Sequence, residues 1–109
     1  MKKILGILAA GLVLSGVVNT AIAVEVRGVA SCGTWIQEQK ADDSHISQLW
    51  LLGFMSGLAT GLERNLLDKT DNPSIFLWMD NYCKANPLKD VYDGGVDLSV
   101  ELTKRKNIK

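Results

Sequence analysis

The chain has few of the residues that build catalytic and metal sites. It contains two cysteines, two prolines and a single histidine, His45. Two cysteines and one histidine give no recognised spacing of zinc ligands, so we expect no metal site and no other cofactor. A nucleophilic cysteine would need a base, and His45 is the only histidine that could serve as one. The sequence therefore predicts no catalytic residue and a protein that is not an enzyme.

A surplus of charge is also missing, because 12 Lys and Arg residues balance 12 Asp and Glu residues. There is no basic stripe with interleaved aromatic residues, so binding to nucleic acid has no electrostatic support. Carboxylate pairs such as Asp42 with Asp43 and Asp90 with Asp93 stand at expected helix caps or on polar faces. Capping or solvation is the common role of such groups, and we do not assign them to catalysis.

What is present at the N-terminus is typical of a secretory signal. A basic start, Met1-Lys2-Lys3, is followed by an apolar run from Ile4 to Val18 and by small residues that end at Ala23. We expect cleavage between Ala23 and Val24, export to the periplasm and no stable membrane insertion afterwards. Residues 1–23 are then a cleaved signal peptide, and residues 24–109 form a single helical domain of 86 residues.

The two cysteines of an exported chain are most simply interpreted as one disulfide between Cys32 and Cys83. Closing a loop of about 50 residues would stabilise so small a domain by roughly 4 kcal/mol. An alternative is lipidation, because Val29-Ala30-Ser31-Cys32 resembles a lipobox. A lipobox adjoins the apolar run, however, and here charged residues separate the two, so the disulfide is the favoured interpretation.

Periodicity predicts four helices and an all-α fold, a small four-helix bundle with one disulfide. The first begins at a Ser31 cap, and the second extends from about His45 to Leu67 with apolar residues at three- and four-residue steps. Asn72-Pro73 predicts the start of a third helix, and Asn86-Pro87 the start of a fourth whose inward stripe begins at Leu88. Gly94-Gly95 weakens the fourth helix in its middle, where a bend is expected.

Three glycines, Gly53, Gly57 and Gly61, stand four residues apart on the predicted second helix. Each destabilises a helix by about 0.5 to 1 kcal/mol relative to alanine, so a row of three indicates a geometric need. We expect them to form a helix-packing groove in which a neighbouring helix or a tryptophan ring lies close. In lipid the same spacing is a helix-dimer motif.

Three segments carry a resemblance: SCGTW at 31–35, WLLGFMSG at 50–57 and FLWMDNYCKANPL at 76–88. The chain resembles a family of small exported proteobacterial proteins with these motifs. It is more distantly similar to the Rap/Tai-type immunity proteins, which block peptidoglycan-cleaving effectors of type VI secretion, and to the HdeA-type acid-stress periplasmic chaperones. Both are small helical folds with a disulfide, and the resemblance implies the pairing of Cys32 with Cys83.

The resemblance implies a small periplasmic protein that binds another protein and does no chemistry. One hypothesis is an immunity-type inhibitor of a cell-wall-degrading effector. The alternatives are an HdeA-like holdase that protects unfolded clients in acid, or an envelope accessory protein with neither activity. The expected partners are an effector, an unfolded client or, in a homodimer, a second copy of the chain. A specific binder is slightly favoured, because no cluster of carboxylates stands out that acid could discharge.

Overall fold

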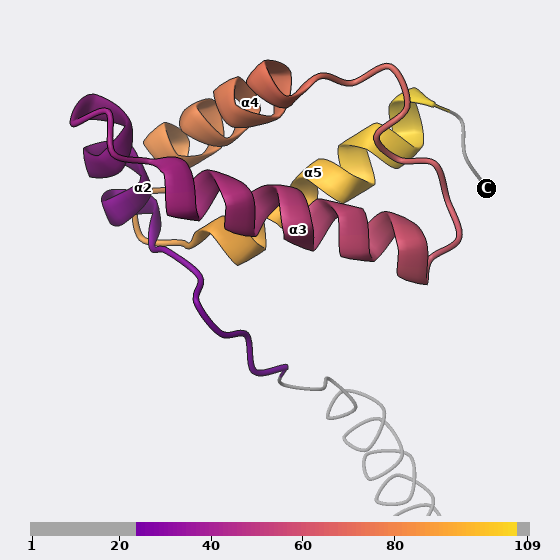
Figure 1. Cartoon of the computed structure of the whole chain (residues 1–109), viewed down its shortest axis with the longest axis horizontal. Coiled ribbons are helices and arrows are strands. Elements are labelled where there is room, and N and C mark those ends of the chain that lie inside the picture. Colours follow the sequence, from indigo (N-terminus) through magenta and orange to yellow (C-terminus); the bar gives the residue numbers. More distant parts are fainter. Residues whose placement is uncertain (1–23, 107–109) are drawn as a thin grey trace, which may run out of the picture.

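The computed structural model describes residues 24–106, and these form an all-α bundle of four helices, as predicted (Figure 1). The helices are α2 (Cys32–Lys40), α3 (His45–Gly61), α4 (Asn72–Ala85) and α5 (Val91–Arg105). Residues 24–106 contain no strand, only an isolated bridge between Ser31 and Asp90. The predicted signal peptide and the Ala23 side of its cleavage site lie outside the described residues.

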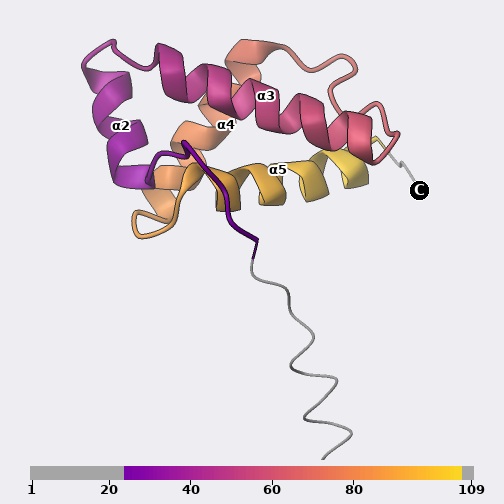
Figure 2. The ribbon, with the colours of Figure 1, turned by 60° about the horizontal axis from the view of Figure 1, so that its bottom comes forward.

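The helices pack around α5. It contacts both α3 and α4, whereas α2 packs on α4 at one end of the bundle. Figure 1 shows α3 crossing in front of α5, and Figure 2 shows the two running side by side. α3 and α4 both pack against α5, and one side of α3 remains exposed.

Local hydrogen bonds explain where three of the helices begin. The Ser31 hydroxyl accepts a bond from the main-chain N–H of Thr34 at 3.0 Å, which confirms the predicted cap of α2. Asp90 caps α5 in the same way through the N–H of Asp93 at 2.8 Å. At α4 the cap is Asp71, one residue before the Asn72 that the sequence indicated, and its carboxylate accepts from Ser74 N–H at 2.8 Å.

The second helix ends earlier than predicted. The periodic pattern continued to Leu67, but α3 ends at Gly61, and Glu63 adopts a left-handed conformation with φ of 54°. The chain then turns, and Leu66 is fully buried from this loop. The apolar spacing at the end of the pattern therefore reflects burial of a loop residue rather than a further turn of helix.

The fourth helix begins later than predicted. Asn86-Pro87 does not start it; these residues and Leu88 form a turn, and α5 starts at Val91. The Leu88 side chain is 99% exposed, so its assignment to the inward stripe was wrong. Two main-chain bonds tie this turn back to the start of α2, from Cys32 N–H to the Lys89 carbonyl at 2.9 Å and from Val91 N–H to the Ala30 carbonyl at 3.0 Å.

The α5 helix is continuous through its glycine pair, from Val91 to Arg105. Gly94 and Gly95 are the places where helices approach closely. A Cβ atom on Gly94 would lie 2.6 Å from the Met79 sulfur of α4, and one on Gly95 would lie 2.7 Å from the ring of Phe54 in α3. Glycine at these two positions lets α5 lie this close to both of its neighbours.

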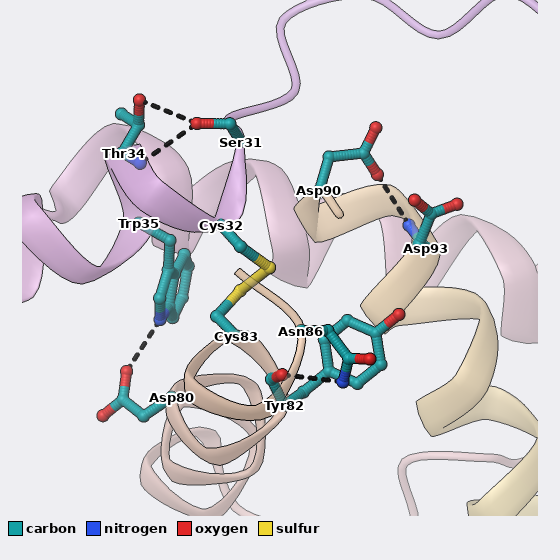
Figure 3. The surroundings of a disulfide bond; sticks show 10 residues. All are labelled: Ser31, Cys32, Thr34, Trp35, Asp80, Tyr82, Cys83, Asn86, Asp90 and Asp93. Atoms are coloured by element: carbon teal, nitrogen blue, oxygen red, sulfur yellow. Dashed lines mark hydrogen bonds between the residues drawn. A yellow bond between two sulfur atoms is a disulfide. The ribbon is translucent and has the colours of Figure 1, made fainter. Parts of the chain in front are cut away.

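A disulfide joins Cys32 of α2 to Cys83 of α4, as predicted, with their Cα atoms 4.8 Å apart (Figure 3). Both cysteines are buried, and so is Trp35 beside them. The Trp35 indole N–H donates to an Asp80 carboxylate oxygen at 2.7 Å, which satisfies the buried donor and fixes α2 on α4. The rest of the core consists of aliphatic and methionine side chains from α3, α4 and α5, namely Leu51, Met55, Ile75, Met79, Val91, Leu98 and Leu102.

Candidate functional site

The outer side of α3 is exposed and carries no charge. The residues on it recur at three- and four-residue steps; we call them the α3 surface, and they are Ile46, Leu49, Gly53, Ser56, Gly57 and Thr60, with Gly61 at the edge. Ile46 is 80% exposed and Leu49 53%, so both aliphatic side chains face away from the core. The Thr60 hydroxyl donates to the Ser56 carbonyl at 2.9 Å, so it is turned back onto the helix. The α3 surface therefore combines two exposed aliphatic side chains with small residues and carries no charge.

The predicted helix-packing groove at Gly53, Gly57 and Gly61 is not found. All three residues are exposed, and a Cβ atom built on any of them would meet nothing within 4 Å. No neighbouring helix or ring of the described chain lies against the row, so the prediction of an internal groove was wrong. Within this domain nothing requires the glycines, yet each destabilises the helix by about 0.5 to 1 kcal/mol. Their shared property is that they leave the backbone of α3 accessible from outside.

A shallow groove borders the N-terminal end of the α3 surface. It has a volume of about 440 Å³ and lies between residues 25–27 and the α3 residues Leu49, Trp50, Gly53 and Phe54. The Trp50 indole N–H donates to the Arg27 carbonyl at 2.8 Å, which holds the incoming chain against α3. Trp50 also stacks on Phe54, with ring centroids 5.2 Å apart. This edge of the α3 surface is therefore rigid.

Sequence periodicity missed the exposed side of α3. Ile46 and Leu49 belong to the same apolar pattern as the buried Leu51 and Met55, because α3 is apolar on all sides and no single stripe stands out. The sequence did contain one sign of this exposed side, because α3 has more apolar residues than a single buried face can hold. The three tryptophans differ in burial: Trp35 is fully buried, whereas Trp50 and Trp78 are half-buried, with their indole N–H groups bonded to the Arg27 carbonyl and the Glu101 carboxylate.

The groups considered for chemistry are dispersed. His45 is exposed at the start of α3, and Asp42 and Asp43 lie in the turn before it. Asp90 caps α5 with its carboxylate bound to the N–H of Asp93 (Figure 3). Within residues 24–106 no three His, Cys, Asp or Glu side chains are grouped as metal ligands would be. In the same range no helix is long and apolar enough to cross a membrane.

The pKa of the Tyr82 hydroxyl is raised above its ordinary value. The hydroxyl is buried and finds no hydrogen-bond partner among residues 24–106. Loss of hydration is the main cause of the raised pKa, and the carboxylates of Asp97, Asp93 and Asp90 add to it by repelling a phenolate. The folded state therefore favours the neutral phenol.

We expect Tyr82→Phe to stabilise the protein, by up to about 1 kcal/mol, because it removes a buried hydroxyl without a partner. The preference of the folded state for the neutral Tyr82 phenol adds to the free energy of unfolding. This contribution is fully present below the ordinary tyrosine pKa of about 10 and is lost as pH rises through the higher pKa of the folded state. Urea melts from pH 7 to 11 should therefore show the wild type losing stability above about pH 10 relative to the variant. Equal alkaline losses for both proteins would contradict this assignment.

Comparison of the chain with protein-family models, with curated proteins and with solved structures finds no match.

Proposed function

We propose that the protein is a small, non-enzymatic binding protein of the bacterial envelope that holds one specific protein partner on the α3 surface. The observation that carries the proposal is the row Gly53, Gly57 and Gly61, which faces outward with nothing of the described chain against it. A helix that keeps three destabilising glycines on an exposed side is suited to a partner whose backbone or ring must approach closely. The exposed side chains of Ile46 and Leu49 would be covered in the same contact.

The scaffold suits a preformed binding surface. The disulfide and the Trp35–Asp80 hydrogen bond fix α2 on α4, while Gly95 lets α5 pack closely under α3. A rigid surface loses little conformational entropy on binding, which favours affinity for one partner. A buried disulfide also supports an oxidising compartment and so the predicted periplasmic location. The partner class that we propose is a cell-wall-degrading effector, which such an immunity-type protein would block.

A crosslinking experiment in the native host tests the proposal. A photo-activated amino acid at Ile46 on the α3 surface should capture a single protein, which mass spectrometry identifies. The matched control is the same amino acid at Leu77, an apolar residue of α4 that is 60% exposed. Capture at Ile46 and not at Leu77 supports the proposal. Equal capture at both sites, or a product that contains only a second copy of the chain, would contradict it.

A holdase would have to expose new apolar surface in acid, whereas a specific binder would not. We expect the protein to stay folded well below neutral pH, with no strong rise in hydrophobic-dye fluorescence. Hydrogen bonds from Ser74 lower the pKa of the Asp71 carboxyl. The stability that the ionised Asp71 carboxylate contributes is therefore fully present above the ordinary carboxyl pKa. It is lost as pH falls through the lower pKa of the folded state. Since Asp71 is fully exposed, that loss is small.

The measurement is an acid titration followed by circular dichroism and dye fluorescence, alongside suppression of aggregation of a denatured client. Dye uptake and client protection that appear together only in acid would contradict a specific binder and would support the holdase.

A further inference from the structure

A second groove lies away from the α3 surface, between the first half of α4 and the last half of α5. Its volume is about 400 Å³, and no residue of α3 lines it. The loop between α3 and α4 closes one end, and Figure 1 shows this loop passing beside the C-terminal end of α5. The Lys106 ammonium donates to the Asp68 carbonyl and so ties the end of α5 to the loop. The groove is thus built by three segments that are held together.

The floor of this groove is apolar. Ile75 from α4 and Leu98 and Leu102 from α5 are all buried in the core cluster, so they form a fixed surface. The Trp78 indole forms a wall, and its N–H donates to the Glu101 carboxylate at 3.2 Å. The floor therefore presents aliphatic and aromatic carbon, while the polar atom of Trp78 is already satisfied.

The rim is cationic. Lys69, Arg105 and Lys106 line it against a single carboxylate, Glu101, which leaves two uncompensated positive charges among the lining residues. Both oxygens of Glu101 are engaged, one by Trp78 and the other by the Arg105 Nε at 2.9 Å. Asp68 and Asp71 flank the loop outside the lining, and the Asp71 carboxylate is bound to the N–H of Ser74. The hydroxyl-bearing residues Thr70 and Ser74 complete the rim.

We propose that this groove binds a single-chain alkyl carboxylate. The apolar floor would cover the alkyl tail, and the head would lie at the rim between Lys69 and the Arg105–Lys106 end of α5. Charge complementarity favours an anion, because the residues that line the groove carry three positive charges against one carboxylate. At about 30 Å³ per water molecule the volume corresponds to roughly 13 waters, so it suits a ligand of about a dozen non-hydrogen atoms. Decanoate has that size, whereas a two-chain lipid is too large.

The test is a titration of the purified, isotope-labelled protein followed by amide chemical shifts. Decanoate is expected to shift Lys69, Thr70, Ser74 and the last turn of α5, and to saturate at high-micromolar to millimolar concentration, as befits so small a ligand. Acetate, which has the head without the tail, should cause no saturable shift there. Decyltrimethylammonium, which has the tail with a positive head, should bind at least tenfold more weakly.

Substitutions in the groove test whether decanoate binds there. The double variant Lys69→Gln/Arg105→Gln should weaken decanoate binding at least fivefold, whereas Lys104→Gln, which removes an exposed cation of the same helix outside the groove, should not. Filling the groove with Ser74→Phe should abolish binding, with circular dichroism confirming that the variant is folded. Equal binding of decanoate and decyltrimethylammonium, or unchanged affinity in the double variant, would overturn the proposal. Binding of a peptide with a free apolar C-terminus but not of decanoate would also overturn it.

Discussion

Replacing Cys32 and Cys83 together by alanine is expected to lower the free energy of unfolding by about 4 kcal/mol. The bridge closes a loop between residues 51 positions apart and restricts the unfolded chain more than the folded one. A domain of this size has a total stability of only about 4 to 13 kcal/mol, so the loss takes a large share of it. Urea unfolding followed by tryptophan fluorescence measures the change directly.

A reductant supplies the control for the cysteine variant. Dithiothreitol should lower the unfolding midpoint of the wild type toward that of the double variant and leave the variant itself unchanged. Because both cysteines are buried, reduction of the folded wild type should be slow and should require opening of α2 from α4. A loss of less than about 1 kcal/mol in the variant would show that the packing of Trp35 alone holds α2 in place.

Gly95→Leu is expected to lower the free energy of unfolding by about 2 to 3 kcal/mol, because it overpacks the contact between α5 and α3. A Cβ atom at Gly95 already lies 2.7 Å from a Phe54 ring carbon. The ring has no room to retreat, since Trp50 stacks on it and Tyr92 meets it edge-on, with ring centroids 5.2 Å and 5.4 Å away. A leucine at position 95 therefore requires α5 to shift or the Phe54 ring to move.

Gly57→Leu is the matched control for Gly95→Leu. It introduces the same side chain into another helical glycine, but one with nothing within 4 Å, so the gain in helix propensity should raise stability by about 0.5 kcal/mol or more. Urea melts of the two variants and the wild type compare both changes in one experiment. Destabilisation of equal size in both variants would contradict the outward placement of the α3 glycines.

The features that the sequence predicts well are those decided locally. Ser31 caps α2 because its hydroxyl needs only the N–H three residues on, and that spacing is visible in the sequence. The disulfide was predicted from the presence of two cysteines in a chain that we expect to be exported. Leu88 shows the limit of periodicity: its spacing fits an inward stripe, but the turn at Asn86-Pro87 is bonded to the start of α2 and leaves the side chain in solvent.

The roles of the glycines could not be predicted, because they depend on which elements meet in space. Gly57 and Gly95 have the same local preference, yet one faces solvent and the other faces an aromatic ring. Likewise, the cationic groove joins residues of the loop, α4 and α5 that only the tertiary fold brings together. The uncovered side of α3 was hidden because its exposed and buried positions are almost equally apolar.

The most direct test of the α3 surface is the affinity of the partner captured at Ile46 for wild type, Gly57→Leu and Leu77→Gln, measured by calorimetry with purified proteins. Gly57→Leu leaves the free protein folded but places a side chain where the partner must approach, so we predict at least a hundredfold weaker binding. Leu77→Gln changes an exposed apolar residue of α4 and should leave the affinity within twofold of the wild type. Unchanged affinity for the stable Gly57→Leu variant would contradict the assignment of the α3 surface as the binding site.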